Sequence, residues 1–454
     1  MLRHSTVRFW YNSKTMSENI RVRFAPSPTG KVHIGNIRAA IYNWLYARHT
    51  GGKFLLRVED TDLERSTPEA IQALLECMRW LGLDYDEDAF YQTKNKPRHM
   101  EAVEKLLASG HAYRCERTSR DGKTGEVIMF KMPTEGVIEF DDIVKGRMSK
   151  KAEDIQDFAI VRSDGSPIFH IANVVDDIDQ GVTHIIRGDD HVENTFKHIC
   201  MFKALGAPVP KYGHLSMIVN QQGKPYSKRD GAAFVGEFRD QGYLPDALFN
   251  YLLLLGWNPG DDREVLTKSE MIELFDLAKV HVTAAKFDMK KLQWMNGEYI
   301  KRMPKDVFTS ELVRRVNEAG MTIPEGYDTD YLVDQLQIRT KFLNDIPGAC
   351  RCFFSDEFEM DEKAVEKRLK KEGVKALLLD LVERFKNAGE WKAPALENLV
   401  KELSQGNGMG PWVHPIRVAV SGRGEGIGLF EMLQLLGREK TLERLANAAE
   451  KYAL

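Results

Sequence analysis

The sequence predicts an α/β domain that is built on a parallel sheet and carries an α/β insertion, followed by an α-helical C-terminal domain. Three observations support this fold class. Strand-like and helix-like segments alternate over residues 20–81 and again over 182–219, as in sheets whose parallel strands are joined by helices. Between these stretches, residues 112–169 contain short polar strand patterns and turn signals, which indicate an insertion. After about residue 300 the amphipathic segments have helical spacing.

The first alternating stretch defines one edge of the predicted sheet. Its segments are a strand at 20–25, a Pro- and Gly-rich loop at 26–30, a helix at 33–49, a strand at 53–59 and a helix at 68–81. Ser66 and Thr67 are natural N-cap residues for the second helix. Since ligands of parallel sheets bind at the carboxyl ends of the strands, residues 26–35 and 59–62 should border one crevice.

The later segments follow the same logic. We expect a strand at 182–187, a helix at 193–205, a strand at 214–219 and a polar loop at 221–231, then helices near 305–319, 329–345, 362–388, 395–405 and 428–452.

Composition limits the possible classes of protein. A chain of 454 residues exceeds one typical hydrophobic core. No apolar run approaches the roughly 18 residues of a membrane-spanning helix, so no membrane association is expected. The net charge of −3 gives no overall preference for nucleic acid, so RNA contacts would have to come from local basic clusters such as 94–99, 145–151 and 286–291. Five scattered cysteines without CxxC spacing suit a reducing compartment and predict no zinc site.

Two segments carry residues suited to phosphate chemistry. The turn at 26–30 leads into a helix with His33 and Gly35 in its first turn, and free backbone N–H groups at a helix N-terminus bind anions. The loop 223–231 carries the adjacent cations Lys228 and Arg229, which could move onto phosphates in a transition state. Taken singly, the first segment also fits a structural helix start and the second an ordinary solvated turn.

Together the two segments resemble the signatures of class I aminoacyl-tRNA synthetases. His33-Ile34-Gly35-Asn36 is similar to the HIGH signature, and residues 225–229, PYSKR, are similar to KMSKS. The glutamyl branch of that family is resembled by RFAPSPTG at 23–30, RVEDTD at 57–62, HIANVVDD at 170–177, RGDDH at 187–191, KLQWMNGEYI at 291–300 and GLFEMLQLLG at 428–437. The resemblance covers about residues 20–454.

The resemblance implies a set of site residues. The positions that match the family's amino-acid site are Arg23, Ala25, Ser27, Glu59, Phe169, Asn173 and Arg187. Those that match its ATP site are His33, Gly35, Asp190 and Lys228, with His33 and Lys228 expected to be catalytic. A glutamate pocket needs an arginine fork for a carboxylate and an acid for the ammonium. We expect Arg23 and Arg187 as the forks and Glu59 as the acid.

The resemblance also implies a division into domains. We expect an extension at 1–20, a Rossmann-type catalytic domain at 21–98 and 169–228, an acceptor-end-binding insertion at 99–168, a connecting domain at 229–303 and a helical anticodon-binding domain at 304–454.

Three departures from the family pattern bear on the site. Phe169 stands where the family often has Tyr, so a hydroxyl is missing. Pro225 replaces the first Lys of KMSKS, and whether Lys224 takes over its role is open. Cys115 is the single cysteine of the insertion, which does not support the zinc site of some members. For Asp60 and Asp62 we favour helix capping or ion pairing over a magnesium role.

The implied function is ATP-dependent ligation of L-glutamate to tRNA(Glu) through glutamyl-adenylate, with Mg²⁺ accompanying ATP and no protein nucleophile. A monomer in the cytoplasm is expected, or an organellar matrix if residues 1–15, which contain four basic or histidine residues and no acid, form a transit segment. A glutamyl transferase that modifies a tRNA base would lack the helical domain, and a non-catalytic paralogue would lack the His or Lys of the signatures. Whether glutamine tRNA is also charged stays open.

Overall fold

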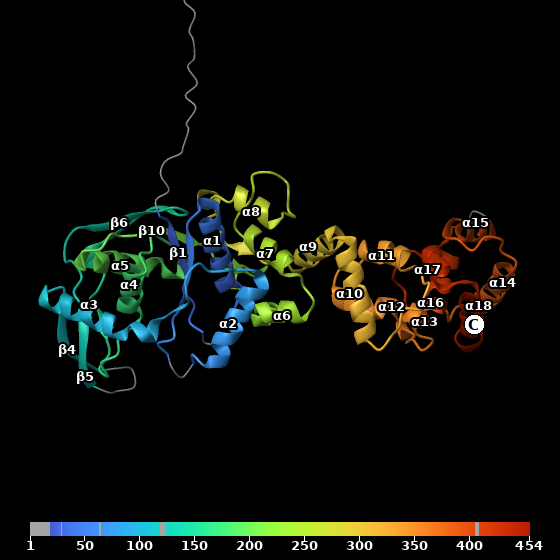
Figure 1. Ribbon diagram of the computed structural model, residues 1–454, viewed down its shortest axis with the longest axis horizontal. Helices are drawn as coiled ribbons and strands as arrows, with labels where there is room; N and C mark the ends of the chain where they lie inside the picture. The colour runs from blue at the N-terminus through green and yellow to red at the C-terminus, as the bar shows by residue number, and fades with distance from the viewer. Residues whose placement is uncertain (1–18, 29, 63–64, 119–123, 405–407) are drawn as a thin grey trace, which may run out of the picture. The chain divides into compact units, whose positions relative to one another are not determined.

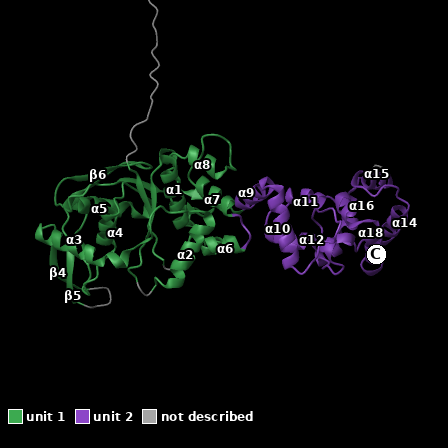
Figure 2. Ribbon diagram, viewed as in Figure 1, with its two compact units in different colours: residues 1–240, 245–289 green, residues 241–244, 290–454 purple. Residues whose placement is uncertain are grey.

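The computed structural model describes residues 19–28, 30–62, 65–118, 124–404 and 408–454. They form two compact units (Figure 2), unit 1 within residues 1–240 and 245–289 and unit 2 within 241–244 and 290–454. The expected extension at 1–20 lies almost entirely outside the described residues. The six-part division expected above stays a prediction.

Unit 1 is built on parallel strands, as the alternating segments predict (Figure 1). One sheet holds β1 (Arg21–Phe24), β2 (Lys53–Val58) and β3 (Phe90–Tyr91). The other holds β9 (His184–Gly188), β10 (Lys211–Leu215), β6 (Val137–Asp142) and the antiparallel β7 (Gly146–Lys151). β1 lies beside β9, because the backbone N–H of Thr183 donates to the carbonyl of Arg21 at 3.0 Å. The strand order 3-2-1-9-10 therefore reverses between β1 and β9, the point where such sheets bind ligands.

Helix α1 (Ile34–Thr50) packs against β1, β2 and β9 and fixes the start of the crevice. Helix α2 (Pro68–Leu81) begins at its expected N-cap, where the Thr67 hydroxyl accepts from the N–H of Ala70 at 3.3 Å. The other helices of unit 1 are α3 (Lys96–Ala108), α4 (Phe169–Asp179), α5 (Val192–Ala204), α6 (Val235–Asp240), α7 (Pro245–Leu254) and α8 (Lys268–Leu274). The short 3₁₀ helices of the two units are η1 (Gln92–Asn95), η2 (Ala152–Asp154), η3 (Asp189–His191), η4 (Lys228–Asp230), η5 (Leu277–Lys279) and η6 (Leu343–Asp345).

The insertion is joined to the catalytic sheet and does not form a separate layer. Its antiparallel sheet consists of β4 (Ala112–Thr118), β5 (Thr124–Phe130) and β8 (Phe158–Val161). Its strand β6, however, pairs in parallel with β10, with Asp142 opposite Tyr212. Insertion residues such as Phe130 and Ile160 share one buried core with Phe196 and Phe202 of α5.

The predicted continuous strand at 214–219 is wrong. β10 ends at Leu215, and β11 (Ile218–Val219) pairs with a different strand, β12 (Ala285–Lys286). The Ser216 carbonyl between them accepts from the buried guanidinium of Arg38. A partner strand about 70 residues later cannot be read from local alternation.

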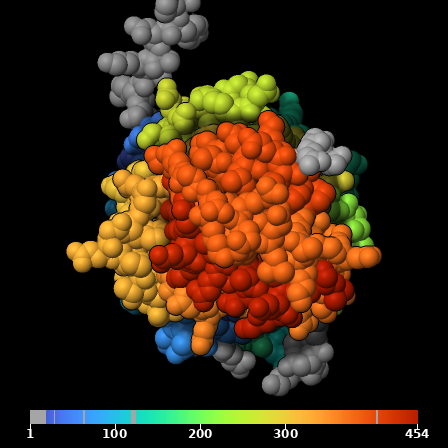
Figure 3. All heavy atoms as spheres, turned by 90° about the vertical axis from the view of Figure 1, so that its right-hand side faces the viewer, coloured from blue at the N-terminus to red at the C-terminus, as the bar shows by residue number. Residues whose placement is uncertain are grey.

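Unit 2 is wholly helical. Its helices are α9 (Met289–Arg302), whose first residue belongs to unit 1, α10 (Lys305–Glu318), α11 (Thr329–Gln337), α12 (Ile346–Phe354), α13 (Glu362–Arg368), α14 (Val374–Lys386), α15 (Ala393–Leu403), α16 (Gly410–Ser421), α17 (Leu429–Leu436) and α18 (Arg438–Lys451). Apolar residues of these helices form one continuous core. α14 packs along α18, and orange and red atoms of these C-terminal segments lie side by side in Figure 3.

Several predicted helices of unit 2 are interrupted. The predicted helices at 362–388 and 428–452 are each two helices, separated at Gly373 (φ 84°) and Gly437 (φ 80°), whose left-handed conformations break the helical path. The helix predicted to reach residue 345 ends at Gln337. Helices α12 and α16 are not among the predicted elements, because prolines in their sequences weaken the helical signal. Within the described part of the chain, no helix combines the length and hydropathy needed to span a bilayer.

Candidate active site

A cleft of about 660 Å³ opens at the carboxyl ends of β1, β2, β9 and β10. Its walls come from the loop after β1, the first turns of α1 and α4, and the loops after β9 and β10. The predicted site residues that line it are Arg23, Ala25, Ser27, His33, Gly35, Glu59, Phe169, Asn173, Arg187 and Asp190. Lys228 does not line it. Residues that are far apart in the sequence therefore meet where the strand order reverses.

A buried ion network occupies the floor of this cleft. Asp177 accepts from Nε of Arg23 at 2.9 Å and from an Nη of Arg57 at 2.5 Å. Arg57 also pairs with Glu59 at 3.3 Å, and the Asn173 amide donates to the same Glu59 oxygen at 2.8 Å. All five side chains are buried. The four charged groups are two cations and two anions, so the network is neutral as a whole.

The network changes the protonation behaviour of its acids in opposite directions. Burial alone would raise the pKa of Asp177, but Arg23 and Arg57 outweigh it and hold the pKa below its usual value. Burial raises the pKa of Glu59, and the nearby arginines offset this only in part. Asp177 is therefore firmly ionised. The ionised form of Glu59 is less stabilised by its surroundings, and a further positive group nearby would favour it.

Arg187 differs from the other two arginines because it contacts no carboxylate within the described residues. Its Nε lies 3.3 Å from Nε2 of His214, and one Nη donates to the Thr195 hydroxyl at 2.7 Å and to the His191 carbonyl at 3.2 Å. Burial lowers its pKa to about 10, which still leaves it charged at neutral pH. Arg187 is thus a buried positive charge of the cleft that no neighbouring acid in the described chain neutralises directly. Arg38, another buried arginine of the lining, instead donates to the backbone carbonyls of Leu255 and Ser216.

The first turn of α1 forms the opposite wall. His33 is its N-cap residue, and Nδ1 accepts from the backbone N–H of Gly35 at 3.0 Å. Burial lowers the pKa of His33, against the opposing effect of a backbone hydrogen bond with Tyr226, so the ring is neutral and its Nε2–H is a donor. No acidic side chain lies in the first turn of α1, which suits an anion site.

The loop after β11 is ordered by its own hydrogen bonds. Ser227 and Asp230 form a capping box around η4, and Asp230 also accepts from the Asn220 amide at 2.8 Å. Tyr226 is buried and packs on Phe287, with 4.4 Å between ring centroids. Lys228 is exposed and has no ion-pair partner among the residues that the structure describes. The hydrogen bonds thus fix the conformation of this loop, and Lys228 on it is a cation without an ion-pair partner in the described chain.

The remaining predicted positions have simpler surroundings. Phe169 lies at the start of α4 among the rings of His170, His191 and His198, with centroids 5.5 to 5.8 Å away. Asp190, whose side chain is two-thirds exposed, lies 3.5 Å from His191. Asp60 accepts from the backbone N–H and hydroxyl of Thr93 at 2.8 and 2.6 Å, and Asp62 pairs with Arg65 at 2.6 Å. These contacts match the capping and ion-pairing interpretation of the two acids.

The residues that hold the predicted ones in place are absent from the sequence-based set. Arg57 and Asp177 lie inside motifs that resemble the family, at the start of 57–62 and the end of 170–177, but the resemblance assigns them no role. His214 is predicted only as part of a strand. Buried charges are usually paired with an opposite charge. Arg57 lies in the otherwise apolar run 54–58, and this position could have predicted a buried acid elsewhere in the chain.

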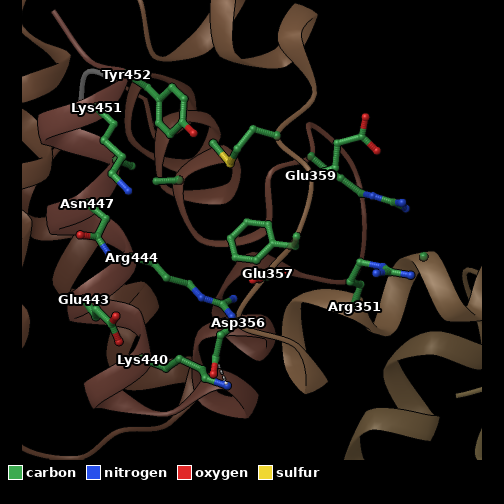
Figure 4. A pocket seen from close by; sticks show the side chains of 16 residues that line it. Arg351, Asp356, Glu357, Glu359, Lys440, Glu443, Arg444, Asn447, Lys451 and Tyr452 are labelled. Atoms are coloured by element: carbon green, nitrogen blue, oxygen red, sulfur yellow. Dashed lines mark ion pairs between the residues drawn. The ribbon is translucent and has the colours of Figure 1, made fainter. Parts of the chain in front are cut away.

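Unit 2 has two hollows of its own, of about 830 and 870 Å³. In the first (Figure 4), Arg444 donates to the carbonyls of Cys352 and Val420, and Lys440 pairs with Asp356 at 2.9 Å. These cations are engaged in holding the fold. The second hollow is lined by Trp294 (44% exposed) and Ile338 (54% exposed), beside Arg339 and Lys341. Aromatic and basic side chains in one hollow are typical of surfaces that bind single-stranded nucleic acid.

Comparison with known proteins accounts for nearly the whole chain. Residues 19–122 and 119–294 match the family described as tRNA synthetases class I (E and Q), catalytic domain, and residues 274–449 match the anticodon binding domain. The chain is 41% identical to the glutamate–tRNA ligase of Francisella tularensis subsp. novicida, over 95% of this chain and 99% of that protein. It is 40% identical to glutamate–tRNA ligase 1 of Caldanaerobacter subterraneus subsp. tengcongensis, over 95% of this chain and 98% of that protein.

Solved structures agree. The glutamate tRNA ligase of Elizabethkingia meningosepticum in complex with its amino acid is similar with a TM-score of 0.83 and 28% identity, covering 96% of this chain and all of that one. The glutamate-tRNA synthetase of Elizabethkingia anophelis follows with a TM-score of 0.81, 29% identity and the same coverage. Because the family match spans the sheet, the cleft and the helical unit together, the chain belongs to the class I tRNA synthetases of the glutamate and glutamine branch.

Proposed function

We propose that this chain ligates L-glutamate to the 3′ end of tRNA(Glu) in two ATP-dependent steps. The observation that carries the proposal is the charge of the cleft: a neutral network of four buried ions lies next to the buried Arg187, which has no acidic partner among the described residues. The names of the similar proteins support the same reaction.

The charge of the cleft favours glutamate over glutamine. Glutamate carries two carboxylates and one ammonium, so its net negative charge balances the positive charge of Arg187. Glutamine is neutral overall and would leave that buried guanidinium without a counter-ion, which is costly in a desolvated site. In this proposal Arg187 binds one carboxylate and Arg23 presents its remaining donors to the other.

The ammonium group has a matching acceptor set. Oδ1 of Asn173 is buried without a hydrogen-bond partner within the described chain, and it belongs to the amide that donates to Glu59. An ammonium placed between Glu59 and Asn173 would satisfy this oxygen and favour the ionised form of Glu59. Ala25, Ser27 and Phe169 are proposed to shape the rest of the amino-acid pocket.

ATP with its Mg²⁺ is proposed to bind along the first turn of α1. His33 and Gly35 would contact the phosphates from the helix N-terminus, Asp190 would contact the nucleoside side, and Lys228 would close over the phosphates from the loop. Lys224 is a further candidate for a phosphate contact.

The chemistry needs positioning and charge stabilisation, and no protein nucleophile. In the first step a carboxylate oxygen of glutamate bonds to the α-phosphorus of ATP, the bond from that phosphorus to the bridging oxygen of the β-phosphate breaks, and pyrophosphate leaves. In the second step the terminal ribose hydroxyl of tRNA attacks the acyl carbon and AMP leaves, while the hydroxyl proton passes to solvent.

The tRNA is proposed to contact the basic strand β7 with its acceptor end and unit 2 with its anticodon half. The hollow lined by Trp294 and Arg339 is the candidate surface for unstacked bases. We further propose that the protein acts as a monomer in the cytoplasm, with an organellar matrix as the alternative location. Sedimentation velocity of the protein alone would test the oligomeric state, since a monomer has the mass of one chain, 51.8 kDa.

The proposal is tested by aminoacylation with tRNA(Glu) and tRNA(Gln) and with both amino acids. Arg187→Ala should lower kcat/KM for glutamate about 10² to 10³-fold and should lower it much less for glutamine, because only glutamate loses a desolvated charge partner. Arg239→Ala, which removes an exposed arginine paired with Asp240, should leave both values unchanged. Wild-type glutamate kinetics and unchanged discrimination in Arg187→Ala would refute this pocket. Failure of the wild-type chain to glutamylate tRNA would refute the proposed function itself.

A further inference from the structure

The anchor of Arg187 begins in the insertion. Asp142 is the last residue of β6, and its Oδ2 lies 2.6 Å from Nδ1 of His214 in the neighbouring strand β10. Neither side chain has any exposed surface. On the other side of the same ring, Nε2 of His214 lies 3.3 Å from Nε of Arg187. Three side chains from β6, β10 and β9 therefore form a continuous buried chain that ends in the cleft.

The hydrogen-bond chemistry of this chain allows one arrangement. A guanidinium Nε–H can only donate, so Nε2 of His214 must accept and Nδ1 must carry the proton. That proton is donated to Asp142. Burial lowers the pKa of His214, although Asp142 opposes this, which agrees with a neutral ring facing a cation. The carboxylate thus fixes the histidine tautomer. With Nε2 as an acceptor, His214 orients Arg187 together with the Thr195 hydroxyl, which lies 3.1 Å from Nε2 and 2.7 Å from an Nη of Arg187.

Asp142 is itself held by the backbone. Its Oδ1 accepts from the N–H groups of Val144, Lys145 and His214 at 3.0, 2.8 and 3.2 Å. The turn that it caps is also tied to the loop after β9, because Lys145 pairs with Asp189 at 3.2 Å. The end of β6 therefore cannot shift without moving both His214 and the edge of the cleft.

We propose that Asp142 and His214 are positioning residues for glutamate binding, so that the insertion contributes to amino-acid recognition by orienting Arg187. This inference rests on the proposed function, since it gives Arg187 a substrate carboxylate to bind. It assigns to a strand of the insertion a role in the pocket for the small substrate.

Asp142→Asn is the sharpest test because it preserves size and shape. The amide oxygen can still accept from the three backbone N–H groups, but the amide NH₂ now faces Nδ1 of His214 and drives the proton to Nε2, where it opposes the Nε–H of Arg187. The KM for glutamate should rise about 10-fold or more, while the KM values for ATP and tRNA change little.

A matched control lies in the same insertion. Asp157 likewise accepts from a backbone N–H, that of Met132 at 2.7 Å, and from the hydroxyl of Tyr113 at 3.0 Å, but neither partner lines the cleft. Asp157→Asn should leave the KM for glutamate unchanged. If Asp142→Asn does the same while the wild-type enzyme glutamylates tRNA normally, the inference is wrong and the proposed function stands.

A second pair of variants keeps the inference testable even if Asp142→Asn does not fold. His214→Gln can present a side-chain oxygen near the position of Nε2, whereas His214→Leu cannot accept a hydrogen bond. The glutamine variant should keep the KM for glutamate within about 3-fold of wild type, and the leucine variant should raise it at least about 10-fold. Equal KM values in the two variants would overturn the positioning role.

Discussion

Two of the buried arginines near the cleft converge on a single carboxylate, that of Asp177. Its two oxygens accept from Arg23 and Arg57, and it has no exposed surface. A carboxylate in this position sets the direction of Arg23, and through Arg57 it also sets the distance to Glu59. Removing the charge of Asp177 should therefore act first on the free energy of unfolding, and on the reaction only through the positions of Arg23 and Glu59.

Asp177→Asn should lower the free energy of unfolding by ~3–5 kcal/mol at pH 7, because it leaves two buried guanidinium groups with one acid between them. The native pKa of Asp177 lies below its unfolded value, so this stabilisation is fully present above the ordinary carboxyl pKa of about 4 and is lost as the pH falls through the native value. Urea unfolding of both proteins between pH 7 and pH 3 should show the difference in stability narrowing. A difference that stays constant or widens toward acid would contradict the assignment.

For single residues, the sequence predicts which side chains line the site better than it predicts which side chains they contact. Arg23, Glu59, Asn173 and Arg187 can be chosen from sequence because they lie in motifs that resemble a known family. Arg23 is neutralised within the protein because it contacts Asp177, which is 154 residues away in the sequence. Arg187 is not neutralised, because its contact is His214, 27 residues away. Pairing over such separations is set by the fold, and no local pattern records it.

Among the elements of the site, the loop after β11 combines order and exposure. Its base is fixed by the bridge between Val219 and Pro225 and by the capping box of η4. Its cations are accessible to solvent, since Lys224 and Arg229 are exposed along with Lys228. Such a loop can bring a charge to a transition state with a small movement.

Lys228→Ala should lower kcat for glutamylation about 10²-fold or more, with little change in the KM for glutamate, because the lost cation acts mainly on the charge of the transition state. Single-turnover adenylate formation with tRNA present would measure this step directly. Arg229→Ala, at the neighbouring position, serves as the control and should cost far less. Unchanged kcat in Lys228→Ala would exclude it from catalysis.

The elements themselves are predictable where their stop signals are local. Helix α2 runs over the predicted residues because its threonine cap and C-terminal Gly82 flank an amphipathic run. Helices α13 and α14 read as one helix in the sequence because the amphipathic spacing continues across Gly373. The strand predicted at 214–219 fails for another reason, since its two halves pair with different partners.

For the whole molecule, the cysteines bear on whether a metal contributes to the fold. Cys77, Cys200, Cys350 and Cys352 are buried, and Cys115 is half-buried in β4. Within the described ranges, no three His, Cys, Asp or Glu side chains are grouped as a metal ion would need. We expect zinc chelators to leave the melting temperature and the Mg²⁺-supplied activity unchanged. Elemental analysis of purified protein that found one zinc per chain would contradict this.

The pairing of β6 with β10 also constrains how the chain acquires its fold during synthesis. Residues 137–142 of β6 leave the ribosome some 70 residues before β10, the strand that pairs with them. The separation in sequence between β1 and its neighbour β9 is longer still. Long-range parallel pairing is slow and leaves unpaired strand edges exposed in the meantime. The nascent N-terminal half therefore has no complete sheet until residue 215 has emerged, so chaperone binding and the translation rate over residues 143–215 should influence the yield of active enzyme more than they do elsewhere in the chain.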